Sequence, residues 1–212
     1  ASAPEELVQN LIKKIKEDPT IYFLTGDTGY NLVEPIFHVA PDRALNVGVA
    51  EQNMIGVAAG LASEGYKVFF YSIGNFPTLR CMEQIRYDIA YHKANVNIVA
   101  VGGGYAYGSL STSHHATEEI GMLRTIPNMM VCSPSDPSEV KEILQITSSD
   151  SSPSYMRLNR SGEEHIKFID DFELGNLHLA YKGSPKSSKK AFISNGAICN
   201  EVYKDLVDAS SS

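Results

Sequence analysis

The fold of this chain is decided by the stretch LNVGVAEQNMIGVAAGLASEGYKVFF, which runs from Leu45 to Phe70. An apolar run leads into a Gly- and Ala-rich segment with helical spacing, which stops at Gly65 before a second apolar run. Glycine commonly ends helices because it adopts left-handed backbone angles without steric cost. The stretch therefore predicts a strand over 44–49, a helix over 51–65 and another strand over 66–72.

The same alternation continues on both sides of this stretch. Further strands are predicted over 21–26, 96–102, 128–134 and 154–160, and further helices over 78–93, 115–126 and 136–147. Strands that alternate with helices favour an α/β fold, a parallel sheet with helices on both faces. Ligands bind such sheets at the carboxyl ends of the strands. The site is therefore expected among the loops 25–31, 48–52, 72–78 and 102–115.

The chain divides near its C-terminal end. Residues 1–180 are expected to form one domain, and the polar, basic run YKGSPKSSKK (181–190) has the composition of a linker. Residues 191–212 predict one strand and one helix, which cannot bury both faces of a sheet. They are interpreted as the beginning of a second, incomplete α/β domain.

Composition excludes several classes of protein. The net charge of −7 argues against a nucleic-acid partner or an anionic membrane surface. No apolar run reaches the ~18 residues of a transmembrane helix, and the N-terminal segment lacks the apolar core of a signal peptide. Three well-separated cysteines, Cys81, Cys132 and Cys199, favour reduced thiols in a cytoplasmic protein, and no metal ligands are predicted.

The segment NVGVAEQNMIGVAAGLASEGYKVFF resembles the pyrimidine-binding domain of the transketolase family of thiamine diphosphate enzymes. That family reads approximately G-[IV]-A-E-Q-N-M and then A-A-G-L-A-x-x-G. The segments FPTLRCMEQIRYDIAYHKANVNIVAV and LRTIPNMMVCSPSDPSEV continue the likeness in order, over about residues 20–160. The chain is similar in particular to the C-terminal subunit of transketolases that are split into two chains.

The resemblance implies a cofactor site. Glu51 would hydrogen-bond the pyrimidine nitrogen N1′ of thiamine diphosphate and promote the tautomer that deprotonates the thiazolium carbon. Phe76 would stack on the pyrimidine, and Asp27 and Arg80 are further cofactor-binding candidates. Taken without the resemblance, Glu51 has a plainer explanation as a first-turn residue favoured by the helix dipole. Phe76 would then be a core residue, and Arg80 a surface residue in an ion pair.

The loop VGGGYAYGSLSTSHHATEE departs from the family. The family's final histidine falls on His114, a candidate catalytic residue for substrate contact or proton handling. The family's glutamine falls on His115, a substrate-binding candidate, and its phosphate-binding arginine is matched to Arg157. A histidine and an aspartate that bind donor hydroxyls in the family fall on Gly102 and Leu110. The loop therefore predicts added space and an apolar wall, and a modified ketose as donor. The glycines do not have dinucleotide-binding spacing, and the adjacent histidines lack a third metal ligand.

Half of the cofactor site is absent from the sequence. Thiamine diphosphate enzymes bind the diphosphate through Mg²⁺ on a G-D-G…N segment, which this chain lacks. The resemblance therefore implies an N-terminal, diphosphate-binding partner subunit. The chain is expected to form a homodimer, or a heterotetramer with that partner. The expected function is the pyrimidine-binding subunit of a transketolase-like enzyme, which transfers a two-carbon ketol unit from a modified or phosphorylated ketose to an aldose. Alternatives are a deoxyxylulose-phosphate-synthase-like enzyme, a 2-oxoacid dehydrogenase β-type subunit, or a non-catalytic assembly partner.

Overall fold

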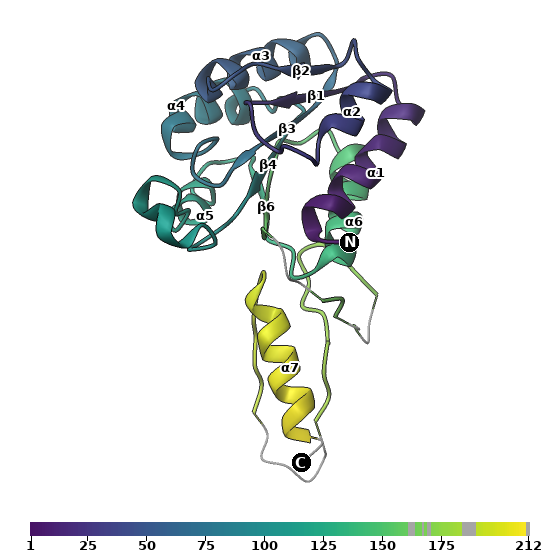
Figure 1. Ribbon diagram of the computed structural model, residues 1–212, viewed down its shortest axis with the longest axis vertical. Helices are drawn as coiled ribbons and strands as arrows, with labels where there is room; N and C mark the ends of the chain where they lie inside the picture. The colour runs from purple at the N-terminus through teal and green to yellow at the C-terminus, as the bar shows by residue number, and fades with distance from the viewer. Residues whose placement is uncertain (161–163, 167, 169–170, 184–189, 211–212) are drawn as a thin grey trace.

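The computed structural model of the 212-residue chain describes residues 1–160, 164–166, 168, 171–183 and 190–210 (Figure 1). These residues contain one sheet of six strands, all of them parallel to their neighbours, in the order β2-β1-β3-β4-β6-β5. The strands are β1 (Ile21–Thr25), β2 (Ala44–Asn46), β3 (Lys67–Ile73), β4 (Val96–Val101), β5 (Met130–Cys132) and β6 (Ser154–Leu158). The predicted α/β fold with a parallel sheet is confirmed.

Helices cover both faces of the sheet. The α-helices are α1 (Ala3–Glu17), α2 (Glu34–Val39), α3 (Glu51–Ser63), α4 (Met82–Gln84), α5 (Glu119–Leu123), α6 (Pro137–Ser149) and α7 (Ile198–Ser210). Two 3₁₀ segments, η1 (Leu79–Cys81) and η3 (Gly108–Ser113), and one π-helix, η2 (Ile85–Tyr91), complete the set among the described residues. No helix in this part of the chain is long and apolar enough to cross a membrane.

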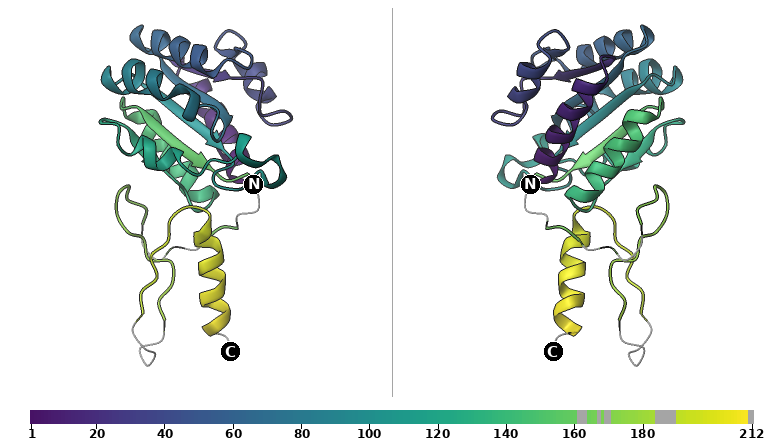
Figure 2. Two further views of the ribbon diagram at one scale, coloured as in Figure 1. Left: turned by 90° about the vertical axis from the view of Figure 1, so that its left-hand side faces the viewer. Right: turned by 90° about the vertical axis from the view of Figure 1, so that its right-hand side faces the viewer.

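The core has two layers, one on each face of the sheet. Figure 2 shows α1 and α6 side by side on one face, and α3 on the other. Because successive side chains of a strand point to opposite faces, β3 contributes to both layers. Phe69 and Tyr71 pack on the face of α1 and α6. Val68 and Phe70 pack on the face of α3, so the central strands are apolar without alternation.

The order of the strands places a topological switch point between β1 and β3. The chain leaves β1 for β2 at one edge of the sheet, and then returns through α3 to β3 on the other side of β1. Ligand sites of open parallel sheets lie outside the carboxyl ends of the strands at such a point. The loops that follow β1, β2, β3 and β4 meet there, as the sequence predicts.

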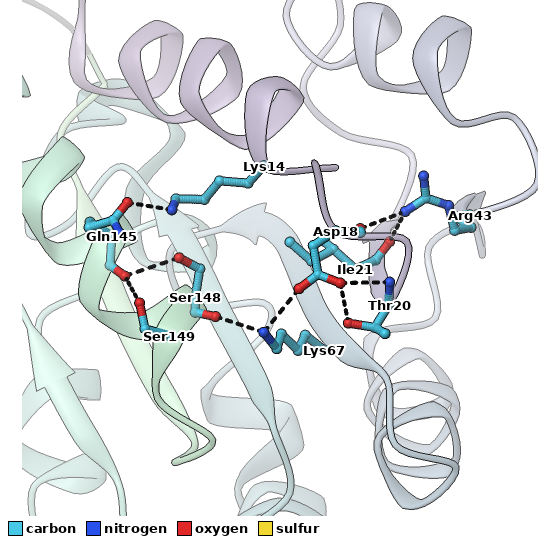
Figure 3. Close-up of polar contacts among 9 residues, drawn as sticks. All are labelled: Lys14, Asp18, Thr20, Ile21, Arg43, Lys67, Gln145, Ser148 and Ser149. Carbon is cyan, nitrogen blue, oxygen red and sulfur yellow. Dashed lines mark hydrogen bonds and ion pairs between the residues drawn. The ribbon is translucent and has the colours of Figure 1, made fainter. Parts of the chain in front are cut away.

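Polar contacts link the elements at the opposite end of the sheet, where the strands begin (Figure 3). The Lys67 ammonium donates to Asp18 Oδ2 at 3.0 Å and to the Ser148 carbonyl at 3.1 Å. The Thr20 hydroxyl donates to Asp18 Oδ1 at 2.5 Å. These contacts join the end of α1, the start of β3 and the end of α6, far from the edge that carries the candidate site.

Several predicted bounds need correction. The strand predicted over 44–49 stops at Asn46, because Gly48 turns the chain with a φ of 72°. The helix predicted over 78–93 is divided into 3₁₀, α and π segments. The helix predicted over 115–126 begins only at Glu119, because Ala116 pairs with Gly104 in an antiparallel bridge.

The C-terminal segment departs from the expected strand and helix. Helix α7 forms, but the described residues 190–195 form no strand. Figure 1 shows α7 beyond the end of the sheet at which β6 terminates. Asn200 of α7 donates to the Ser135 carbonyl at 2.9 Å, and Asp136, the N-cap of α6, also accepts from the Ile166 amide at 2.8 Å. The division at residue 180 stays a prediction, and most of the predicted linker lies outside the described residues.

Candidate active site

Glu51 lies at the first position of α3, at the switch point of the sheet. Its side chain is 1% exposed, and its Oε2 pairs with Arg80 Nη1 at 3.1 Å. The other oxygen, Oε1, is buried and has no hydrogen-bond partner among the described residues. A buried carboxylate oxygen without a donor is costly, so Oε1 is a candidate acceptor for a hydrogen bond from a ligand.

Gly26 allows the end of β1 to approach this carboxylate. A Cβ atom on Gly26 would lie 3.1 Å from both the Gly48 carbonyl and Met54 Cε, and 3.7 Å from Glu51 Oε1. Glycine at position 26 therefore allows the end of β1 to pack closely against Gly48 and Met54 beside the carboxylate.

Arg80 and Phe76 form the next part of the site. The Arg80 guanidinium lies 4.7 Å from the centre of the Phe76 ring, in cation–π geometry, while it pairs with Glu51. The Arg80 carbonyl also accepts a hydrogen bond from the Gln52 side chain at 2.7 Å. Arg80 thus contacts a buried acid and an aromatic ring together, although 48% of its side chain is exposed.

The loop that follows β4 brings His114 to the same place. The His114 ring lies 5.1 Å from the Phe76 ring in an edge-on arrangement, and 5.7 Å from the Tyr107 ring. The Asn75 side chain donates to the Ser113 carbonyl at 2.9 Å and so joins the β3 and β4 loops. The structure therefore brings four sequence-predicted residues together in one cluster, Glu51, Arg80, Phe76 and His114.

The two adjacent histidines have different surroundings. His114 Nδ1 lies 2.9 Å from the Ser113 hydroxyl. His115 Nε2 lies 3.0 Å from the Gly108 carbonyl of its own loop, and the His115 ring contacts the Tyr105 ring. The contacts of His115 therefore stabilise the loop, whereas the ring of His114 meets the Phe76 ring.

Arg157 is part of a buried network behind the loop. Its Nε lies 2.8 Å from Glu119 Oε1, and its Nη2 donates to the Ala116 carbonyl at 2.5 Å. Glu119 is fully buried, and its Oε1 accepts from the Tyr155 hydroxyl at 3.4 Å. Burial raises the pKa of the Glu119 carboxyl above its ordinary value, and the charge of Arg157 opposes this. The contacts of Arg157 are those of a residue that holds the loop.

Asp27 follows Gly26 at the end of β1. Its backbone is in the left-handed region, with a φ of 57°, and its amide donates to Asn46 Oδ1 at 3.0 Å. The Asn46 side-chain amide in turn donates to Asp27 Oδ1 at 3.3 Å. Asp27 is therefore an exposed residue on the rim of the switch point.

Sequence reasoning missed Tyr107 and Arg160. The Arg160 guanidinium lies 5.1 Å from the centre of the Tyr107 ring, and Arg160 is exposed. The Tyr107 ring also covers Gly102, where a Cβ atom would lie only 2.2 Å from Tyr107 Cε2. The added space predicted at Gly102 is therefore filled, and that expectation is wrong. The position of Tyr107 between the glycines of one loop was visible in the sequence. The direction in which its side chain points depends on the tertiary structure and was not.

The residues of this cluster suit the pyrimidine half of thiamine diphosphate. Glu51 Oε1 offers a buried acceptor for a ring nitrogen, and the half-buried Phe76 offers an aromatic surface beside it. Within the described ranges, no group of three or more His, Cys, Asp and Glu side chains could hold a metal ion.

Comparison with known proteins shows the family of the chain. The family described as "Transketolase, pyrimidine binding domain" matches residues 5–162, about three quarters of the chain. The chain belongs to the transketolase family. The family and the domain type that the motif around Glu51 indicates are therefore confirmed.

Two curated relatives and one solved structure show the relation in more detail. The chain is 32% identical over 183 residues to an apulose-4-phosphate transketolase subunit of Phocaeicola vulgatus, covering 85% of this chain and 59% of that protein. It is 42% identical over 146 residues to a "Putative transketolase C-terminal section" of Methanocaldococcus jannaschii, covering 68% of this chain and 46% of that protein. The solved structure "Split gene transketolase, inactive beta4 tetramer" is 34% identical with a TM-score of 0.72, covering 82% of this chain and 57% of that one. The chain thus spans about half to three fifths of the length of these three proteins.

Proposed function

We propose that this chain is the pyrimidine-binding subunit of a thiamine diphosphate-dependent, transketolase-like transferase. The reaction is the transfer of a two-carbon ketol unit from a phosphorylated or otherwise modified ketose to an aldose. The observation that carries the proposal is the buried Oε1 of Glu51, which has no donor among the described residues and whose carboxylate pairs with the arginine that covers the Phe76 ring. The family membership and the relatives named as transketolase subunits support it.

Glu51 and Arg80 would prepare the cofactor. The Arg80 guanidinium holds Oε2 and compensates part of the negative charge, so that Oε1 is left to accept from the pyrimidine nitrogen. When bound, thiamine diphosphate supplies a carbon nucleophile and an electron sink for cleavage of the bond next to a ketone. The Phe76 ring would pack on the pyrimidine and keep water from the Glu51 carboxylate.

His114 and Arg160 would act on the sugar. His114 Nδ1 is engaged by the Ser113 hydroxyl, and its Nε2 makes no hydrogen bond within the described part of the chain. Nε2 would therefore bind a donor hydroxyl or hold a proton there. Arg157 is engaged with Glu119, so we assign anion binding to the exposed Arg160 in its place, and His115 to the support of the loop. Asp27 remains a candidate for binding the cofactor.

A partner subunit would complete the site. We assign Mg²⁺ and the diphosphate to an N-terminal, diphosphate-binding subunit, and the complex to the cytoplasm, consistent with three free cysteines. A homodimer of this chain, or a heterotetramer with the partner, would form on the exposed face of α3. Cβ atoms on Gly56 and Gly60 would meet nothing within 4 Å, so another backbone can approach closely there. The related split-gene transketolase is itself described as a tetramer.

Reconstitution tests the proposal. The chain is mixed with a diphosphate-binding subunit, thiamine diphosphate and Mg²⁺, and ketol transfer to an aldose phosphate is measured from xylulose 5-phosphate and from apulose 4-phosphate. Transfer from either donor supports the function. Cofactor binding without any transfer supports the non-catalytic alternative, and condensation of pyruvate with glyceraldehyde 3-phosphate supports the deoxyxylulose-phosphate-synthase-like one.

A further inference from the structure

The position of Tyr107 changes what the loop presents to a substrate. Gly102 has a φ of 85°, a conformation that side chains other than glycine rarely adopt. A Cβ atom there would lie 2.2, 2.8 and 3.1 Å from Cε2, Cδ2 and Cζ of Tyr107. The ring of Tyr107 therefore lies directly across Gly102 and occupies the space that a side chain at 102 would need.

Tyr107 is also surrounded by groups of the candidate site. Its ring lies 5.7 Å from that of His114, and the Arg160 guanidinium lies 5.1 Å from its centre. The residue is half-buried, and its hydroxyl makes no hydrogen bond within the described residues. The hydroxyl is not among the buried polar atoms without a partner, so it is open to solvent and available to a ligand.

We propose that Tyr107 is a specificity-determining residue, whose hydroxyl hydrogen-bonds a hydroxyl of the ketose donor in place of a side chain at position 102. The inference rests on the proposed function, because it concerns the substrate of the same site. Burial raises the pKa of the Tyr107 hydroxyl, so the group is protonated at neutral pH and donates. The loop then selects hydroxylated donors through Tyr107. The apolar Leu110, which is 51% exposed, is a second residue of the loop that the donor would contact.

Paired deletion of the two hydroxyls tests this inference in the reconstituted complex. The donor is whichever of xylulose 5-phosphate and apulose 4-phosphate the wild type uses better. Each analogue of that donor lacks one hydroxyl, chosen among those that take no part in cleavage of the carbon–carbon bond. We expect Tyr107→Phe to lower kcat/KM about tenfold for the full donor and to leave it unchanged for one analogue, since a site that hydrogen-bonds a hydroxyl discriminates against its absence.

Tyr105→Phe is the matched control. Tyr105 lies two residues away in the same loop, is 74% exposed, and packs edge-on against His115 with a ring that the substitution keeps. We expect it to preserve kcat/KM for every donor. Both variants are also compared with the wild type for cofactor affinity and melting temperature, which should not change, because Tyr107→Phe keeps the ring that covers Gly102.

The outcomes separate the two proposals. A wild-type complex that transfers no ketol unit contradicts the proposed function, and this inference with it. If the wild type is active and Tyr107→Phe lowers kcat/KM equally for the full donor and all analogues, the inference alone is wrong. The same conclusion holds if Tyr107→Phe resembles Tyr105→Phe.

Discussion

The two oxygens of Glu51 have different surroundings, and this difference defines the chemistry of the residue. One oxygen is paired with Arg80 and the other is buried without a donor among the described residues. The pair neutralises much of the charge, while the second oxygen keeps its capacity to accept. The arrangement suits a carboxylate whose purpose is to act on a ligand nitrogen rather than to stabilise the helix terminus.

We predict that Glu51→Gln leaves the fold intact and lowers turnover of the reconstituted complex by about 10²–10⁴-fold. The amide has nearly the same shape but lacks the negative charge that a pyrimidine nitrogen requires. Steady-state kcat and deuterium exchange at the thiazolium carbon are the measurements. Glu64→Gln, an exposed glutamate that follows α3, is the control and should keep wild-type rates. Exchange as fast as in the wild type would show that the assignment of Glu51 is wrong.

At the scale of elements, the loop between β4 and α5 is held by contacts on several sides. Gly104 and Ala116 exchange two backbone hydrogen bonds at 2.6 and 2.9 Å, and Arg157 of β6 donates to the Ala116 carbonyl. Gly103 lies so close to Arg157 that a Cβ atom there would be 1.9 Å from its Nε. The loop can therefore present His114 at a defined place although its residues form no long helix or strand.

We predict that Glu119→Gln destabilises the chain by about 2–3 kcal/mol, because it leaves the partly buried Arg157 without its counter-charge. Urea unfolding measures this change, and hydrogen exchange at the Gly104 and Ala116 amides should become faster. Glu118→Gln, at the neighbouring exposed position, should alter neither quantity. Unchanged stability together with unchanged exchange would mean that the ion pair does not hold the loop.

The opposite edge of the sheet leads to a prediction about acid stability. The Thr20 hydroxyl and Lys67 lower the pKa of Asp18 from 3.8 to about 2. Because this pKa is lower in the folded state, Asp18 stabilises the fold above pH 4 and loses its contribution as the pH falls through 2. We expect Asp18→Asn to cost about 1 kcal/mol at pH 7, after allowance for solvent screening, and progressively less below pH 4.

Urea unfolding of the wild type and Asp18→Asn between pH 7 and pH 2.5 measures this difference. Asp42→Asn, which replaces an exposed aspartate outside the network, is the comparison and should not show this dependence on pH. A difference between wild type and Asp18→Asn that is constant across the range would contradict the role of the ionised carboxylate.

Local and tertiary features differ in how far they could be predicted from the sequence. The strand–helix alternation and α3 follow from periodicity, whereas the cluster of Glu51 with Phe76 and His114 follows from the resemblance to the transketolase family. The pairing of Arg157 with Glu119, and the cover of Gly102 by Tyr107, depend on how separate segments meet in three dimensions. The division of the helix after Phe76 into three helical types likewise has no signal in its apolar spacing.

Under the proposed function, the molecule as a whole holds one half of a cofactor site. The Glu51 cluster would bind the pyrimidine, and the sequence lacks the G-D-G…N segment that the resemblance implies for Mg²⁺ and diphosphate. The diphosphate carries most of the charge of thiamine diphosphate, and charge-assisted hydrogen bonds and metal contacts are the strong ones. Affinity should therefore depend on a second chain.

We predict that this chain alone binds thiamine diphosphate with a Kd above about 100 μM, and that adding a diphosphate-binding subunit with Mg²⁺ tightens binding by at least about 100-fold, or about 2.7 kcal/mol. Titration calorimetry of the chain, the partner and their mixture measures both affinities. Phe76→Ala should weaken binding in the mixture, since the aromatic surface acts on the pyrimidine while the partner holds the diphosphate. Low-micromolar binding to the isolated chain would contradict the division of the site between two subunits.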